Sequence, residues 1–213
     1  DPARRFTDFG MVREQLAETY ERLVGQTAPQ PALEAELEAV DWNNKGVSLK
    51  NLRLSEEALA CFDRALALNP RDVAAWSNKG VTLGERLGKW EEAIAYLDRA
   101  LKLDPWNADV WCNKGAACGE LRRHEEAFAC LDGALALNPR LGKAWCNKGA
   151  ALGASGRNEE AICHYDRALA RDPRDERAWY GRGVALGRLR QHEQALACFE
   201  CALALNPRYE QAW

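Results

Sequence analysis

Tryptophan recurs along this 213-residue chain at nearly constant intervals. The successive spacings are 34, 35, 34, 34 and 34 residues, and the six positions are Trp42, Trp76, Trp111, Trp145, Trp179 and Trp213. Each of the first five opens a near-copy of one phrase, which is Trp-Cys-Asn-Lys-Gly at two of them. A fixed period between about 20 and 50 residues indicates stacked repeats rather than one globular core. The sequence therefore predicts a surface built by repetition, without an intrinsic catalytic cleft.

One repeat can be followed from Trp76. Small and apolar residues at helical intervals predict a first helix, and Gly88 lies in the short turn that follows it. Glu91 and its neighbour then place negative charge at the start of a second helix, where the helix dipole favours it. Asp104 ends that helix, because a residue that precedes proline avoids helical geometry. The same order recurs, so each repeat predicts two helices joined by a short turn.

This order resembles the tetratricopeptide repeat family. The family pattern is Trp-x2-Leu-Gly-x2-Tyr, then Ala-x3-Phe and then Pro, on a period of about 34 residues. The match covers about residues 31–213. The resemblance implies an all-α, right-handed superhelical solenoid of antiparallel helix pairs, here with an extra N-terminal helix. We expect repeats to open near Val40, Ala74, Asp109, Lys143 and Arg177, with a sixth that stops at Trp213.

Both ends of the chain differ from an interior repeat. Residues 1–30 precede the array at 31–213, and apolar residues at helical spacing predict one amphipathic helix at 11–24. This helix either caps the first repeat or docks on another chain or in a groove. Residues 32–52 predict an unusually long first helix. Terminal repeats normally need a polar cap, so at Trp213 either the chain is cut from a longer protein or a partner or symmetry mate covers its end.

One departure from the family pattern is systematic. The leucine that precedes the family's glycine is a cation in every repeat, at Lys45, Lys79, Lys114, Lys148 and Arg182. A long cationic stem can cover apolar surface while its charged end reaches solvent. Each second helix also carries an acid 21 or 22 residues after its tryptophan, at Asp63, Asp98, Asp132, Asp166 and Glu200. We expect the cations to pair with such acids in a structural ladder.

Asparagine fills the slot two residues after tryptophan in four repeats, at Asn44, Asn78, Asn113 and Asn147. Resemblance to the family implies that the first helix of each pair lines a concave groove, and that this slot faces it. An amide offers a donor and an acceptor, so it can bond the backbone of an extended peptide without reading its sequence. The alternative is that these amides bond neighbours within the chain, and the sequence leaves both interpretations open.

Glycine fills the slot eight residues after tryptophan in four repeats, at Gly84, Gly119, Gly153 and Gly187. Each glycine costs a helix interior about 1 kcal/mol relative to alanine. Close approach of another backbone is one reason to keep it. Ser77, Cys112 and Cys146, which directly follow tryptophan, add small side chains. The floor of the groove is therefore predicted to be shallow.

Charge is graded along the predicted groove. Its middle carries acids and its C-terminal part carries cations, which suits a ligand of mixed charge or one that is anionic toward the C-terminal repeats. The candidate ligand-binding residues are Asn44, Asn78, Asn113, Asn147, Ser77, Cys112, Cys146, Tyr180, Glu85, Glu120, Lys143, Arg177 and Arg188.

Composition and motifs argue against several other classes of protein. A net charge of −3 and a pI near 5.8 are unlike the basic surface of a nucleic-acid binder. No apolar run approaches the roughly 20 residues of a membrane span. We expect neither enzyme activity nor a cofactor, because no nucleophile–His–acid set or phosphate loop is present. Cys198 and Cys201 are only half of a zinc pattern, so no metal is expected. The eight cysteines suit a reducing cytoplasm, where we expect the protein.

These observations favour a protein–protein interaction scaffold that binds an extended peptide or a helix in its concave groove. Two alternatives stay open. The chain is an adaptor region of a larger enzyme or regulator whose catalysis lies elsewhere, or it is a self-assembly module. A homo-oligomer of this last kind would form through uncovered ends or through the N-terminal helix.

Overall fold

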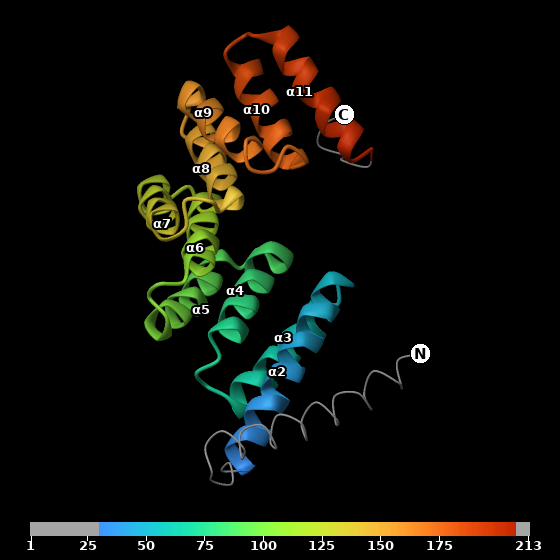
Figure 1. Cartoon of the computed structure of the whole chain (residues 1–213), viewed down its shortest axis with the longest axis vertical. Helices are drawn as coiled ribbons and strands as arrows, with labels where there is room; N and C mark the ends of the chain where they lie inside the picture. The colour runs from blue at the N-terminus through green and yellow to red at the C-terminus, as the bar shows by residue number, and fades with distance from the viewer. Residues whose placement is uncertain (1–29, 208–213) are drawn as a thin grey trace. The chain divides into compact units, whose positions relative to one another are not determined.

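The computed structural model describes residues 30–207, with side chains from residue 38 onward, and this part of the chain is built of helices and short turns (Figure 1). The described helices are α2 (Gln30–Asn51), α3 (Ser55–Leu68), α4 (Val73–Leu87), α5 (Trp90–Leu103), α6 (Ala108–Glu120), α7 (His124–Leu137), α8 (Gly142–Ala154), α9 (Asn158–Leu169), α10 (Glu176–Arg188) and α11 (His192–Leu205). No strand occurs between residues 30 and 207. The predicted all-α class is confirmed, while the predicted helix at 11–24 and Trp213 lie outside the described residues.

The chain divides into two compact units, and the first unit ends at Ala75, inside α4. In the first unit α2 packs against α3. Gly46 of α2 allows this close approach, because a Cβ there would lie 2.6 Å from the fully buried ring of Phe62 in α3. The long first helix predicted at residues 32–52 is confirmed as α2, which begins at Gln30 and ends at Asn51.

The second unit begins at Trp76 and holds four helix pairs, α4 with α5, α6 with α7, α8 with α9 and α10 with α11. Each first helix from α6 onward also packs on the second helix of the preceding pair. In addition, α6 contacts α8, and α8 contacts α10. Figure 1 shows these pairs following one another along the chain, from green α4 to red α11. This is the stacking of a helical solenoid, as the period of the sequence predicts.

The recurring tryptophan fastens the turn that precedes its helix. Its indole Nε1 donates a hydrogen bond to the carbonyl oxygen of the proline six residues earlier. These bonds run from Trp111 to Pro105 at 2.9 Å, from Trp145 to Pro139 at 3.0 Å and from Trp179 to Pro173 at 3.0 Å. The ring also contacts the second helix of its own pair: Trp145 stacks on His164 with centroids 5.3 Å apart. Tryptophan thus joins three consecutive segments, which explains its fixed spacing from proline.

The turn inside each helix pair contains one residue with left-handed backbone. Gly88 and Gly156 supply it in two pairs, with φ of 67° and 85°. Arg53, Arg122 and Arg190 occupy the equivalent slot with φ of 64°, 57° and 61°. A non-glycine residue in this conformation carries a penalty of about 1–2 kcal/mol. The structure therefore extends the turn predicted at Gly88 to pairs that lack the glycine.

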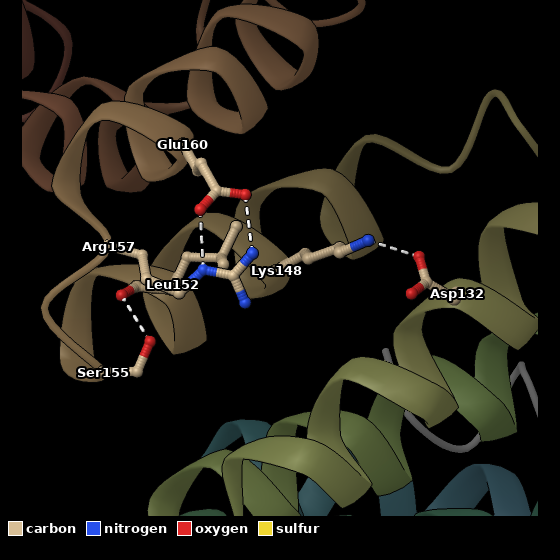
Figure 2. Close-up of polar contacts among 6 residues, drawn as sticks. All are labelled: Asp132, Lys148, Leu152, Ser155, Arg157 and Glu160. Atoms are coloured by element: carbon tan, nitrogen blue, oxygen red, sulfur yellow. Dashed lines mark hydrogen bonds and ion pairs between the residues drawn. The ribbon is translucent and has the colours of Figure 1, made fainter.

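Three of the systematic cations form the predicted ladder, and each of the three reaches back to an acid of the preceding repeat. The pairs are Lys114 with Asp98 at 2.6 Å, Lys148 with Asp132, and Arg182 with Asp166 at 2.7 Å. We call these three pairs the cation ladder. Figure 2 shows Lys148 of α8 reaching Asp132 of α7. The Lys148 side chain is 16% exposed and Asp132 is 59% exposed. Burial of the stem therefore stabilises the stack more than the exposed ion pair does.

Candidate functional site

The first helices of the second unit enclose two adjoining cavities. The first cavity has a volume of about 300 Å³ and is lined by residues of α4, α5, α6, α8 and α10. The second has a volume of about 570 Å³ and is lined mainly by α6 and α8, with one residue from α10. Ala116, Glu120 and Asn147 line both cavities, so the two lie next to each other. We call the residues that line them the groove.

Asn113 lines the groove and is held by hydrogen bonds to two different repeats. Its Nδ2 donates to Ser77 Oγ of the preceding repeat at 3.3 Å, and its Oδ1 accepts from Lys143 Nζ of the following repeat at 2.8 Å. The arrangement recurs one repeat later with Asn147, which donates to Cys112 Sγ at 3.4 Å and accepts from Arg177 Nη2 at 3.4 Å. The asparagines therefore do bond neighbours within the chain. These bonds use one of two N–H groups and one of two lone pairs in each amide.

The slot that directly follows tryptophan lies behind the groove. Ser77, Cys112 and Cys146 are 8%, 0% and 4% exposed, and none of them lines either cavity. Burial raises the pKa of the Cys112 thiol and raises that of Cys146 to about 11, so both thiols are uncharged at neutral pH. Tyr180 fills the same slot and is half-buried, with its ring 5.7 Å from that of Phe199. These four candidates are placed to support the groove from within.

Both signs of charge surround the 300 Å³ cavity. Glu85 and Glu120 come from the last turns of α4 and α6, whereas Lys143 and Arg177 come from the first turns of α8 and α10. Lys143 donates to an uncharged amide rather than to a carboxylate. Within residues 38–207, neither glutamate forms an ion pair with a cation of the chain. The cavity therefore presents carboxylates and cations that a ligand of mixed charge can neutralise.

Two glycine slots of each first helix differ in what surrounds them. At Gly115, four residues after tryptophan, a Cβ would lie 2.6 Å from Leu131 Cγ. At Gly119, four residues further on, no atom lies within 4 Å of such a Cβ. At Gly153 and Gly187 the nearest atoms would be 3.7 and 4.0 Å away, which is ordinary contact. Packing inside the chain therefore requires the earlier glycine but not these three later ones.

Gly84 differs from the other later glycines, because a Cβ there would lie 2.4 Å from the ring of Trp90. Trp90 also lines the 300 Å³ cavity. Sequence reasoning missed this residue, because its slot holds serine, histidine or asparagine in the other repeats and indicates a surface turn. A large aromatic residue in such a polar slot, six residues after a glycine, is the signal that identifies it.

The remaining candidates take separate positions. Arg188 lines the 570 Å³ cavity, and its Nη1 donates to the carbonyl oxygen of Gly153. Asn78 is half-buried on α4, where its own carbonyl accepts from the Thr82 hydroxyl at 2.7 Å. Asn44 is exposed on α2, in the first unit, and is not among the residues that line the two cavities.

Other kinds of site find little support in the described part of the chain. Residues 38–207 hold no group of three or more His, Cys, Asp or Glu side chains placed to bind a metal ion. All eight cysteines are free thiols. No helix from α2 to α11 combines the length and the apolar character that crossing a bilayer requires. The chemistry that the groove offers is amide hydrogen bonding and opposite charge.

Solved structures show what this arrangement is similar to. YrrB, described as a TPR protein with an unusual peptide-binding site, is 25% identical; the match covers 82% of this chain and 89% of YrrB, with a TM-score of 0.57. TTC0263, a TPR protein from Thermus thermophilus, is 22% identical over 82% of this chain and 94% of that one, with a TM-score of 0.75. MamA from Desulfovibrio magneticus RS-1 is 22% identical over 81% and 97%, with a TM-score of 0.63.

Sequence comparisons agree with these structures. No curated protein sequence matches the chain. Tetratricopeptide repeat sequence models match residues 48–111, 85–141, 151–189 and 176–209. Together they cover residues 48–209 except for the short stretch 142–150. The chain belongs to the tetratricopeptide repeat family.

Proposed function

We propose that the second unit binds an extended peptide segment of a partner protein in the groove. Membership of the tetratricopeptide repeat family makes the chain a protein–protein interaction scaffold in general terms. The observation that carries the more specific proposal is the open space over Gly119, beside two asparagines that line the same surface. YrrB, at 25% identity, is described as having a peptide-binding site, which supports a peptide as the class of ligand.

The two asparagines suit an extended backbone because their amides are already oriented. In Asn113 and Asn147 the internal hydrogen bonds hold the amide plane and leave one N–H and one lone pair for a ligand. A preorganised side chain loses less conformational entropy when it binds. The two sequence interpretations of these asparagines, as internal bridges and as a ligand ladder, are therefore compatible.

The glycines and the charges complete the proposed recognition. At Gly119 the absence of a Cβ lets a ligand backbone approach closely, and Gly153 lines the same cavity. An acidic ligand residue would face Lys143, and a basic one would face Glu85 or Glu120. We therefore expect the ligand to carry both signs of charge, because charge complementarity fixes its register and direction.

The proposal is tested with peptides selected from a random library displayed on phage. Affinity of a selected peptide is measured by isothermal titration calorimetry with wild type, with the double variant Asn113→Ala plus Asn147→Ala, and with Glu120→Lys. Loss of two hydrogen-bonding side chains should weaken binding by about 10-fold to 100-fold, at about 1 kcal/mol each. Glu120→Lys should weaken binding of peptides with a basic residue.

Asn138→Ala is the matched control. This asparagine directly follows α7 and lines neither cavity, and its Oδ1 accepts from the backbone N–H of Arg140 at 3.0 Å. Its variant should bind as wild type does, and circular dichroism should show every variant folded. Undiminished affinity of the double variant would exclude a ligand-binding role for the asparagines. Failure to select any peptide would count against the groove as a peptide site.

A further inference from the structure

Trp90 contributes an indole ring to the wall of the 300 Å³ cavity. It is the first residue of α5, and its ring lies against the backbone of α4, because a Cβ at Gly84 would be 2.4 Å from two of the ring carbons. The indole is only half-buried, so part of it is open to the cavity. In the other repeats the equivalent slot holds a smaller polar residue, Ser55, His124, Asn158 or His192.

Trp90 differs from the recurring tryptophans in what lies on its ring. Four of those carry a lysine or arginine of the chain, with its charged end 4.8 to 5.8 Å from the ring centroid. Between residues 38 and 207, no cation of the chain lies over Trp90 and no second ring stacks on it. The negative face of an indole attracts a cation. Trp90 therefore offers a cation-binding surface that no residue of the described chain occupies.

Two carboxylates border the same cavity. Glu85 directly follows Gly84, and Glu120 occupies the equivalent slot one repeat later, nine residues after its tryptophan. Both side chains are exposed, and neither forms an ion pair within residues 38–207. In the other repeats this slot holds Asn51, Ala154 or Arg188. The acids therefore occur in the repeat that contains Trp90 and in the next one.

The two cations that line this cavity are held away from the acids. Lys143 Nζ donates to Asn113 Oδ1 at 2.8 Å, and Asn113 lies seven residues before Glu120 on α6. Seven residues span about 10 Å along a helix axis, which is roughly the Debye length in about 0.1 M salt. Arg177 donates to Asn147, one repeat further along the chain. These cations therefore repel a positive ligand group only weakly where the acids and Trp90 lie.

We propose that this end of the cavity binds an arginine side chain of the ligand, an inference that rests on the proposed peptide-binding function. The planar guanidinium would stack on the Trp90 indole and donate hydrogen bonds to Glu85, Glu120 or both. Its apolar stem would lie against Val81 and Ala116, which are half-buried and line the same cavity. Lysine fits less well, because its compact ammonium neither stacks as a plane nor donates two parallel hydrogen bonds.

The test uses peptides selected on wild type from the random phage library, which should share an arginine at one position. In one such peptide this arginine is replaced by citrulline, which keeps the shape of the side chain without its charge, and separately by lysine. Isothermal titration calorimetry with wild type should show an affinity about 10-fold lower for the citrulline peptide. The lysine peptide should bind between these two.

Variants of the chain then locate the contact. Trp90→Ser, which copies Ser55 of the first repeat, should bind the arginine peptide less tightly and lose most of its preference over citrulline. The double variant Glu85→Gln plus Glu120→Gln should do the same, and it replaces only exposed side chains, so it tests the proposal even if Trp90→Ser lowers stability. Glu91→Gln is the control, because Glu91 is exposed beside Trp90 and lines neither cavity. Its preference for arginine should equal that of wild type.

Two results would overturn this inference and leave peptide binding in the groove intact. One is a set of selected peptides that depend on Asn113 and Asn147 but share no arginine. The other is an arginine peptide whose citrulline form binds wild type equally tightly, or whose preference for arginine persists in the double glutamine variant. Failure to select any peptide would instead overturn the proposed function, and the arginine site with it.

Discussion

Two glycines of α6 have different surroundings, one packed inside the chain and one facing the open groove. Alanine substitutions at these two positions should therefore change stability in different ways. At Gly115 the new Cβ would lie 2.6 Å from Cγ of the fully buried Leu131 and 3.3 Å from the carbonyl oxygen of Ala127. Overpacking of a core costs about 1–3 kcal/mol. At Gly119 the Cβ meets no atom within 4 Å. Both variants gain about 1 kcal/mol of helix propensity, so the difference between them is the overpacking penalty.

The assay is urea unfolding of the two variants, followed by the helical circular dichroism signal. Gly119→Ala should unfold at a higher urea concentration than wild type, because its free energy of unfolding should be about 1 kcal/mol larger. Gly115→Ala should fall about 1–3 kcal/mol below Gly119→Ala. Because both substitutions lie in one helix, any partial unfolding of the array affects them alike. Equal loss of stability in both variants would refute the assignment of Gly119 to open space.

Three further predictions concern stability and thiol reactivity. Lys148→Met keeps the buried stem and removes one charge of the cation ladder, so the free energy of unfolding should fall by less than about 1 kcal/mol. The loss should be smaller still in about 1 M NaCl, because salt screens the ion pair in wild type. A loss that salt leaves unchanged would contradict an ion pair. Burial, and to a smaller extent the neighbouring cations, lowers the pKa of His164 in the folded protein. The stability that the neutral imidazole contributes is therefore complete above its ordinary pKa of about 6.5, and it is lost as pH falls through the lower pKa of the folded state. His164→Tyr, which copies Tyr96 in the equivalent slot, should flatten the decline of the urea midpoint in acid, and a slope equal to that of wild type would contradict this. Ellman's reagent should label exposed Cys163 at neutral pH but reach Cys146 only after unfolding, because burial raises the pKa of that thiol to about 11; early labelling of Cys146, located by mass spectrometry, would argue against its burial.

The repeat period made most of the described fold predictable. Tryptophan, glycine and proline recur at fixed offsets, and each acts within one repeat or between neighbours, so one repeat stands for the others. The cation ladder was predictable for the same reason. The left-handed turn at Arg122 was not, because arginine has no local preference for that backbone and the surrounding helices impose it.

The sequence positions that form the groove were predictable, but the depth at which each side chain lies was not. Resemblance to the family implies that the slots of Asn113 and Ser77 both face the groove. It does not say that Ser77 is buried while Asn113 lines a cavity, because that depends on how closely successive first helices pack. Trp90 was missed for a related reason: its contact with Gly84 joins two helices across a turn, and the repeat pattern offers no second example of it.

Amide chemical-shift mapping of a selected peptide tests the proposed peptide site most directly. The chain has 16 glycines, whose backbone amides can be followed in a ¹⁵N–¹H spectrum during titration. The backbone amides of Gly119 and Gly153, which line the 570 Å³ cavity, should shift with the peptide. Gly133 of α7, which lies beside Trp111 and lines neither cavity, should not shift. Shifts at Gly133 with none at Gly119 or Gly153 would contradict peptide binding in the groove.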